Sequence, residues 1–512
     1  MYFYRLYYRI ILFFKLSVDS WRLMERITGI QFLSGVFWRL TEVILTRGVS
    51  LAVSIILARL LMPSDYGLIV LTMVFILFSD IFIQNGFNIS LIRQPIADLI
   101  DYSTVMYLSY ASALILYSIF FLASPMIAQY YSKPELSAVL RVLALVLFFK
   151  AGAAVIRAKA IKEMQFKLMS FITFIASVVS GIVGVIMAVY SMGVWALVAQ
   201  QLAYYFLDMT LLVLIFKWRF NFNFSISVAK KLFSFSANVI GAGFLDFAAN
   251  NVANLFIGKL YPPKYLGYIS RGSLLPEQVY TLAFNSVNMV ILPVLASRQD
   301  DISCMKKAVR KMLVMATYLS FPMMGGLALV GRNLILLLLT DKWLPCVPIM
   351  QWYCLTYACN MIRSINGNVF YARGASKIVF VIEVIRCVLM ILNMIVSLII
   401  FKVNVYKFVM LNSLLAVFVV FISQIAVNRV IGYKCRELFK DIYAPALMTF
   451  LMMYFMYLIG KLAFSPNLIM CIQITIGIFV YAALSFVFKA SGFSELLKIF
   501  KLFFERITLL RK

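Results

Sequence analysis

The sequence consists mainly of long hydrophobic runs separated by short polar turns. Many runs reach about 20 residues, the length that an α-helix needs to cross a bilayer. The pattern therefore predicts an all-α polytopic membrane protein, and the short run 334–339 is expected to extend its ninth helix. We expect about 14 transmembrane helices, centred in residues 34–58, 67–92, 104–128, 136–156, 168–190, 194–216, 232–257, 273–296, 310–331, 346–370, 378–401, 405–428, 442–463 and 467–488.

Two of the turns between hydrophobic runs have related sequences. The first is RLLMPSDYG at Arg59–Gly67, and the second, 200 positions later, is KLYPPKYLG at Lys259–Gly267. A cation, a leucine, a proline and a glycine occupy the same offsets in both. Transporters are commonly built from two related repeats with the substrate site between them. The echo therefore predicts a chain with two related halves.

Composition and charge agree with a membrane protein. Hydrophobic residues make up 64% of the 512 residues and charged residues only 13%, which excludes a soluble globular class. The formal net charge is +27. Successive loops alternate between the two sides of the membrane, and the segments on the same side as the N-terminus carry roughly three times as many Lys and Arg as the loops on the other side. This bias predicts that both termini are cytoplasmic. The excess charge then indicates contact with anionic lipid and not with nucleic acid.

The remaining composition narrows the chemistry. Histidine is absent, which excludes imidazole catalysis, and the seven cysteines lack metal-ligand spacing, so we expect no catalytic site, metal or cofactor. Residues 1–30 are basic and aromatic, and we expect an interfacial cytoplasmic segment there. A signal peptide or a start at Met24 are the alternatives. A basic amphipathic tail is expected at 491–512.

An ordered set of segments resembles one known family. In chain order the segments are Gly35–Trp38, Ala58–Leu68, Phe78–Gln94, Tyr130–Leu136, Gly193–Leu202, Leu266–Tyr280, Leu292–Asp301, Leu337–Met350 and Ile365–Lys377. Together they resemble Wzx-like polysaccharide-transport flippases of the MOP superfamily (multidrug, oligosaccharidyl-lipid and polysaccharide exporters) over residues 32–380. One departure is Ile81–Gly86, where family members usually carry a glycine-rich stretch, so the local helix geometry there is open.

The resemblance implies a fold of two pseudo-symmetric six-helix bundles around a central cavity, with two further helices. The corresponding ranges would be 31–216 and 232–430 for the bundles, 217–231 for a cytoplasmic linker, and 431–490 for the added helices. The family moves lipid-linked oligosaccharide on an undecaprenyl pyrophosphate carrier from the inner to the outer leaflet of the bacterial cytoplasmic membrane. Alternating access coupled to a Na⁺ or H⁺ gradient, and a polysaccharide polymerase and glycosyltransferases as partners, are implied likewise.

Cations inside the predicted helices are candidates for contacts with an anionic head group, because a charge within a membrane is costly. Arg47 has no acidic residue three or four positions away and is the first candidate, with a structural pair to Asp80 as the alternative. Lys150 could attract the carrier at the inner mouth, although extension to the inner head groups is favoured over that role. Arg39 with Glu42, and Arg386 with Glu383, are expected to be structural pairs.

Two polar stripes are expected to face the interior, because lipid cannot satisfy them. The first contains Asp80, Gln84 and Asn88, and the second Asp246, Asn250 and Asn254 with Asn251 adjacent. They could line a cavity or make interhelical hydrogen bonds. For the second stripe a role in lining a cavity is favoured. For the first stripe both alternatives stay open.

Two lone carboxylates, Asp208 and Glu277, are candidates for binding a coupling cation, with pairing to a cation on another helix as the alternative. A multidrug or lipid II transporter of the same superfamily is the competing function. A membrane enzyme of polysaccharide assembly is disfavoured because the outer loops are short and histidine is absent.

Overall fold

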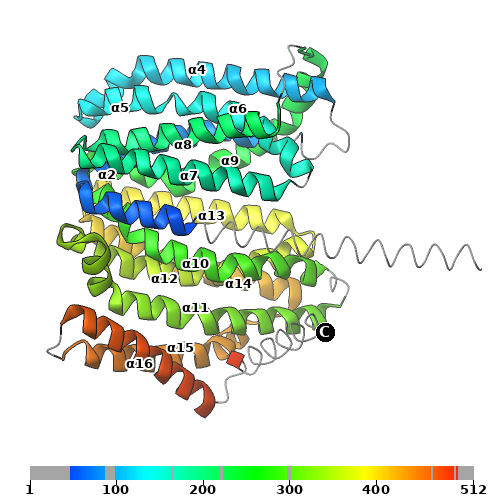
Figure 1. The fold of residues 1–512 in the computed structure, drawn as a ribbon. Coiled ribbons are helices and arrows are strands. Elements are labelled where there is room, and N and C mark those ends of the chain that lie inside the picture. Colours follow the sequence, from blue (N-terminus) through cyan, green and yellow to red (C-terminus); the bar gives the residue numbers. More distant parts are fainter. Residues whose placement is uncertain are drawn as a thin grey trace, which may run out of the picture. The chain divides into compact units, whose positions relative to one another are not determined.

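The computed structural model describes residues 47–86, 91, 98–163, 165–218, 223–296, 301–462, 465–488 and 492–493. Regular structure in these ranges is entirely helical, and Figure 1 shows long helices running side by side. Residues 47–60 are helical. The helices that follow are α2 (Pro63–Asp80), α4 (Leu99–Tyr131), α5 (Glu135–Leu143), α6 (Val146–Lys162), α7 (Phe166–Val189), α8 (Val194–Ile215), α9 (Ile226–Leu260), α10 (Lys264–Ala296), α11 (Ile302–Leu339), α12 (Val347–Ala372), α13 (Ser376–Met394), α14 (Val405–Ile431), α15 (Cys435–Ile459) and α16 (Pro466–Val487).

Within the described residues the predicted hydrophobic segments coincide with helix, the first of them from residue 47 on, so the all-α membrane class is confirmed. Ten helical segments of the described chain are long and apolar enough to cross a membrane. The run 334–339 does extend the ninth predicted helix, since α11 ends at Leu339. The positions of the termini and the count of fourteen stay predictions, and the two predicted basic ends lie outside the described residues, apart from 492–493.

The chain divides into two compact units. Unit 1 comprises Met1–Leu57, Ser79–Ser124 and Ala138–Ile240, and unit 2 comprises Ala58–Phe78, Pro125–Ser137 and Gly241–Lys512. Helices α2, α4, α5 and α9 therefore pass from one unit into the other along the chain. This division reflects packing and not internal repetition. The predicted limits of the two six-helix bundles stay a prediction.

In unit 1, α8 packs against α6 and α7. Small residues allow this close approach, as is common between membrane helices. A Cβ atom added at Gly184 of α7 would lie 2.9 Å from Gln200 of α8, and one added at Gly152 of α6 would lie 2.9 Å from Met209 of α8. The glycines are therefore places where neighbouring helices touch.

In unit 2, α12 is the central helix and packs against α10, α11 and α14. Its fully buried residues Ile365, Val369 and Phe370 belong to a core that also contains Leu313 and Val427. Helices α15 and α16 pack against each other and against α11. This arrangement gives α12 neighbours on several sides, and its polar residues are enclosed by protein.

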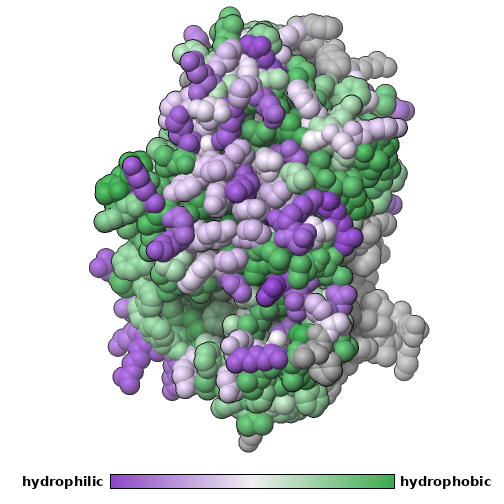
Figure 2. Space-filling view, turned by 90° about the vertical axis from the view of Figure 1, so that its left-hand side faces the viewer, coloured by the Kyte–Doolittle hydropathy of each residue, from purple (hydrophilic) through white to green (hydrophobic). Residues whose placement is uncertain are grey.

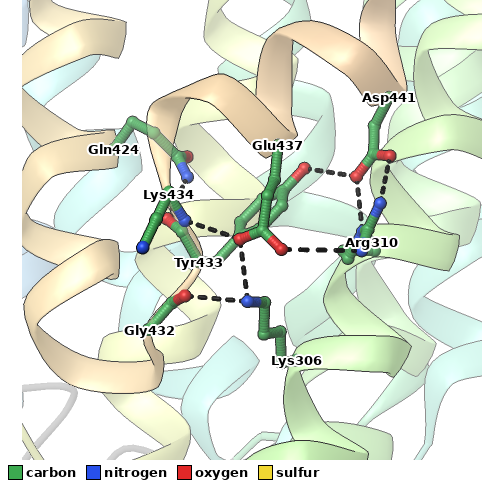
Figure 3. A network of polar contacts seen from close by, with 8 residues as sticks. All are labelled: Lys306, Arg310, Gln424, Gly432, Tyr433, Lys434, Glu437 and Asp441. Carbon is green, nitrogen blue, oxygen red and sulfur yellow. Dashed lines mark hydrogen bonds and ion pairs between the residues drawn. The ribbon is translucent and has the colours of Figure 1, made fainter.

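A network of charges links α11 to α15 (Figure 3). Arg310 donates two hydrogen bonds of 2.7 Å to the two carboxylate oxygens of Asp441, and Lys306 Nζ lies 2.7 Å from Glu437. The Tyr433 hydroxyl donates to Asp441 at 2.8 Å. Such a two-pronged arginine–carboxylate contact fixes orientation as well as energy. The network holds the start of α15 against α11.

The two related turns are equivalent in structure and contact each other within unit 2. The first turn, Leu61–Met62, lies between the helix 47–60 and α2, and the second, Tyr261–Pro263, lies between α9 and α10. A Cβ atom added at Gly67 would lie 1.9 Å from the carbonyl oxygen of Pro263, and one at Gly267 would lie 2.1 Å from that of Pro63. This reciprocity is typical of a twofold relation. Only glycine permits such a close approach of the two backbones.

The turns are enclosed by further hydrogen bonds within unit 2. Trp343 is fully buried, and its indole N–H donates to the Ala58 carbonyl at 2.8 Å. Lys342 donates to the Arg59 carbonyl at 2.7 Å, and Lys133 donates to the Gly258 carbonyl at 2.5 Å. We call the contact of Pro63 and Gly67 with Pro263 and Gly267 the turn clasp. It closes this end of unit 2 with main-chain contacts.

The segment Ile81–Gly86, whose geometry the sequence leaves open, forms the π-helix η1 directly after α2. A π-helical turn inserts a residue into the regular hydrogen-bond pattern and changes the direction of the side chains that follow. A second π-helical segment, η3 (Ile395–Ile400), follows α13. A shared face for Asp80 and Gln84 therefore does not follow from their four-residue spacing alone.

The surface separates apolar and polar regions as a membrane requires. Large apolar side chains such as Leu122 and Phe479 are each 75% exposed on the helices. Figure 2 looks onto the end of unit 2 that carries the 3₁₀ turn η2 (Asp341–Cys346), and polar side chains cover much of this end. Exposed apolar flanks indicate contact with lipid.

Candidate functional site

A cavity with a volume of about 600 Å³ lies within unit 2. Its walls come mainly from α9, α10, α12, α13 and α14. Polar side chains from several of these helices line it, among them Asn250 on α9, Ser273 on α10 and Asn360 on α12. The volume is within the range of small-molecule sites in proteins. The polar residues of the sequence are thus concentrated around an internal space.

Two arginines provide the positive charge of the cavity. Arg363 on α12 and Arg386 on α13 both line it, and both contact the carboxylate of Glu383. Arg386 Nε donates to Glu383 at 2.7 Å, and the side chain of Arg386 is only 13% exposed. A longer contact of 3.4 Å joins Arg386 to the amide oxygen of Asn250. The carboxylate keeps two partly buried cations paired.

The rest of the wall offers amides, hydroxyls and aromatic rings. The asparagines that line it are Asn250, Asn251, Asn254, Asn360 and Asn412. Tyr353 and Tyr357 from α12 lie beside them with ring centroids 6.2 Å apart. Amides both donate and accept hydrogen bonds, and tyrosine combines an apolar face with a polar hydroxyl. This combination suits a ligand that carries many hydroxyl groups.

One carboxylate, Glu277 of α10, lines the same cavity and is exposed to it. The Tyr357 hydroxyl donates a hydrogen bond to it. Among the described residues no ion pair joins Glu277 to a cation. Glu277 is therefore the cavity group best placed to take up a cation.

Unit 1 contains two buried ion pairs. Lys150 donates to both carboxylate oxygens of Asp80 at 2.8 and 3.0 Å, and the Lys150 side chain is 4% exposed. Arg157 contacts the carboxylate of Asp208, which is 4% exposed. Lys150 therefore does not extend to the head groups, and that expectation is wrong. The Asp80 carboxylate attracts the Lys150 ammonium group strongly, because the two charges are close together and little water surrounds them.

The structure brings together only part of the predicted set. Asn250, Asn254 and Glu277 line one cavity, and Asp80 and Lys150 form a pair in unit 1. Asp208 is paired with Arg157, so the alternative of a partner on another helix holds for it. Arg47 is half-buried in the helix 47–60. The roles of all these residues in substrate binding or ion coupling stay predictions.

Three predicted residues are described incompletely or not at all. Gln84 lies in η1 and Asp246 in α9, and the structure describes the backbone of both but not their side chains. Asn88, like Arg39 and Glu42, lies outside the described residues. Their placement stays a prediction.

Sequence reasoning missed Arg363 and underrated Arg386. Arg363 lies within the tenth predicted helix, 346–370, which the structure extends to Ala372 as α12, but it is not among the candidates named from the sequence. The missed signal is a stripe on α12 in which Tyr353, Thr356, Asn360 and Arg363 recur every three or four residues. All four residues line the cavity.

A small second cavity lies in unit 1, with a volume of about 200 Å³. Seryl and glutaminyl groups line it, among them Ser50, Ser177 and Gln200. It contains none of the charged candidates. The larger cavity of unit 2 is therefore the candidate functional site.

Taken together, the helices define a polytopic membrane protein, and its unit 2 contains a cavity lined by arginine, asparagine and tyrosine side chains. The chain belongs to the family described as polysaccharide biosynthesis protein, whose model matches residues 56–348.

Two curated relatives come from bacterial polysaccharide pathways. The chain is 24% identical over 313 residues to the teichuronic acid biosynthesis protein TuaB of Bacillus subtilis, a match covering 59% of this chain and 63% of TuaB. It is 22% identical over 371 residues to the lipopolysaccharide biosynthesis protein WzxC of Escherichia coli, covering 70% of this chain and 73% of WzxC. The family named from the sequence is thereby confirmed.

A solved structure shares the fold. The lipid II flippase MurJ, in an inward closed conformation, superposes with a TM-score of 0.73 over 90% of this chain and 98% of its own. The sequence identity is 16%, so this likeness concerns the fold alone. It agrees with the MOP-type architecture that the resemblance implies.

Proposed function

We propose that this protein moves a lipid-linked oligosaccharide on undecaprenyl pyrophosphate from the inner to the outer leaflet of the bacterial cytoplasmic membrane. It acts as a transporter and not as an enzyme, and its product serves surface polysaccharide biosynthesis. Transport follows alternating access and is coupled to a Na⁺ or H⁺ gradient. Glycosyltransferases act before it and a polysaccharide polymerase acts after it. Anionic lipids contact its basic surfaces.

The observation that carries this proposal is the wall of the 600 Å³ cavity. A diphosphate–sugar head group is anionic and rich in hydroxyls, so it needs cations and amide groups inside an otherwise apolar protein. Arginine suits phosphate because its planar fork donates two parallel hydrogen bonds. The cavity supplies two arginines, five asparagines and two tyrosines. An apolar drug would need no such lining.

The names of the relatives support a role in polysaccharide export but not one polymer. TuaB is named for teichuronic acid and WzxC for lipopolysaccharide. These polymers differ in their sugars, so the glycan moved by this chain is left open in the proposal.

Deletion of the gene in its host tests the proposal. We expect loss of the surface glycan and accumulation of undecaprenyl-linked oligosaccharide in the inner leaflet, measured with a membrane-impermeant sugar label. Arg47→Ala is expected to reproduce the deletion, and Arg47→Lys to retain part of the activity because it keeps the charge. Normal glycan display by a well-expressed Arg47→Ala protein would exclude a role for Arg47.

Two further measurements separate the competing functions. Increased sensitivity to cationic drugs after deletion, with surface glycan unchanged, would favour a multidrug transporter. Rescue of cells depleted of their lipid II flippase would favour lipid II as the substrate. We expect neither result.

A further inference from the structure

Glu383 lies between the two arginines of the cavity and contacts both. It is one turn before Arg386 on α13, and Arg363 reaches it from α12. The Glu383 side chain is 37% exposed, more than those of Arg386 and Arg363, at 13% and 27%. The carboxylate is therefore the most accessible member of this group. We call Arg363 and Arg386 the arginine pair, and Glu383 its counter-ion.

The carboxylate satisfies only part of the hydrogen-bonding capacity of the arginines. A guanidinium group has five N–H donors, and two such groups together have ten. Glu383 accepts one hydrogen bond from each of them. In the described part of the chain, the buried Nε of Arg363 has no acceptor at all. A ligand with more acceptor oxygens would satisfy the pair better.

We propose that Arg363 and Arg386 form the site for a diphosphate group, and that Glu383 occupies this site as an internal counter-ion until the diphosphate displaces it. This inference rests on the proposed function and assigns the part of the cavity that binds the charged portion of the carrier. A diphosphate diester brings two negative charges and several free oxygens, whereas Glu383 brings one charge and two oxygens. Exchange of one for the other therefore favours the diphosphate at the arginines.

The counter-ion also explains how binding can be reversible. Two arginines without a partner would be costly in a partly buried site, and they would hold a diphosphate too firmly for release. Glu383 stabilises the empty site and competes with the bound ligand. Transport requires such a balance, because a carrier must leave the site on the far side of the membrane. Glu383 thus sets the affinity.

Besides Arg363 and Arg386, the charged residue that lines the cavity is Glu277, and it accepts a hydrogen bond from the Tyr357 hydroxyl on α12. It belongs to α10 and makes no ion pair with the arginines among the described contacts. Glu277 is therefore not the group exchanged at this site, and its variants are kept for a separate test.

Binding of inorganic pyrophosphate to the purified full-length protein in lipid nanodiscs tests the site by isothermal titration. Glu383→Gln removes the competing charge at nearly constant shape, and we expect it to bind about tenfold more tightly, or 1.4 kcal/mol. Arg386→Gln and Arg363→Gln are each expected to bind at least tenfold more weakly. Arg386→Lys should lie between, because it retains the charge and loses the fork.

Asp441→Asn is the matched control. It also removes one carboxylate from an arginine, since Asp441 holds Arg310 with two hydrogen bonds, but this pair lies outside the cavity lining. We expect wild-type affinity for pyrophosphate in this variant. Equal tightening in Asp441→Asn and Glu383→Gln would overturn the site, because the effect would then reflect net charge alone. Wild-type binding by Arg386→Gln would overturn it as well.

The source of the diphosphate is distinguished by the ligand used. A short-chain prenyl diphosphate sugar, soluble pyrophosphate and a nucleotide sugar all carry the group, and competition among them is measured on the same protein. Tightest binding of the prenyl compound assigns the site to the lipid carrier, and tightest binding of the nucleotide sugar contradicts that source. If Glu383→Gln does not fold, Glu383→Asp serves instead and is expected to bind slightly more tightly than the wild type, because the shorter side chain reaches the arginines less well.

The two proposals can fail separately. If deletion leaves the surface glycan intact while the arginine variants still lose pyrophosphate binding, the proposed function fails and the site stands. If deletion abolishes the glycan but Glu383→Gln and the arginine variants bind as the wild type does, the site fails and the function stands. We expect Glu383→Gln to reduce glycan display as well, because a tightly held substrate leaves slowly.

Discussion

At the scale of single residues, charges within the apolar helices are held by partners from other helices. Lys150 is paired with Asp80, 70 positions earlier, and Arg157 with Asp208, 51 positions later. In unit 2, Glu383 serves two arginines at once. An unpaired charge in such surroundings costs several kcal/mol, so each pair also fixes how its helices pack.

The Lys150–Asp80 pair makes a first prediction. Asp80→Asn leaves a buried ammonium without its partner, and we expect it to lower the free energy of unfolding by about 3–5 kcal/mol. The double variant Lys150→Met with Asp80→Asn removes both charges and should recover most of that loss. Thermal unfolding in nanodiscs measures both. A double variant that is stable but inactive in glycan export would instead assign the pair to the transport path.

The Glu383 counter-ion shows why pairing could not be read from local sequence. The spacing of Glu383 and Arg386 indicates a pair on one helix, and this is what the structure contains. Arg363, however, reaches the same carboxylate from a different helix. Sequence spacing describes neighbours on one helix, whereas contacts between helices depend on their packing. The sequence could therefore predict that polar side chains line a cavity, but not which residues from different helices come together there.

At the scale of helices, the hydrophobic pattern predicted more than the charges did. Within the described residues the predicted spans coincide with helix, because in a membrane an apolar run of about 20 residues satisfies its backbone hydrogen bonds by forming a helix. The pattern missed the break between α5 and α6, since both flanks are equally apolar. It also gave no reason to single out Arg363, because a hydropathy pattern does not show which face of a buried helix meets a cavity.

The turn clasp makes a prediction at this scale. Gly67→Ala or Gly267→Ala would place a methyl group within about 2 Å of the backbone of Pro263 or Pro63, so the backbone must move. We expect each to lower the free energy of unfolding by about 1–3 kcal/mol. Gly326→Ala is the control, since its added Cβ would meet only methyl groups at 3.9 Å.

The control should be neutral or slightly stabilising, because alanine favours helix more than glycine does. Thermal unfolding of the three variants under one condition makes the comparison. Equal stability of Gly67→Ala, Gly267→Ala and Gly326→Ala would show that the clasp contributes nothing. A loss confined to the two clasp variants would confirm that the duplicated turns stabilise each other.

At the scale of the whole molecule, apolar exteriors and a polar cavity divide the sequence between two environments. Apolar side chains are exposed along the helices, and the polar stripes of α9 and α12 point into one space. The membrane class follows from composition alone, whereas the site depends on which stripes meet. The sequence favoured a cavity for the α9 stripe, and the structure adds α12 and α13 as its partners.

The proposed coupling to an ion gradient would be a property of the whole transport cycle, and Glu277 is the cavity carboxylate that we expect to provide it. Of the two coupling candidates, Asp208 is held by Arg157 in unit 1, whereas Glu277 faces the cavity and is bound by a neutral tyrosine. We expect an imposed Na⁺ or H⁺ gradient to accelerate transport in proteoliposomes by the wild type and not by Glu277→Gln. The variant should still bind pyrophosphate, because the arginine pair is unchanged. Asp208→Asn should instead lower stability and keep the response to the gradient. A gradient response that persists in Glu277→Gln but disappears in a folded Asp208→Asn would reverse this assignment and move coupling to unit 1.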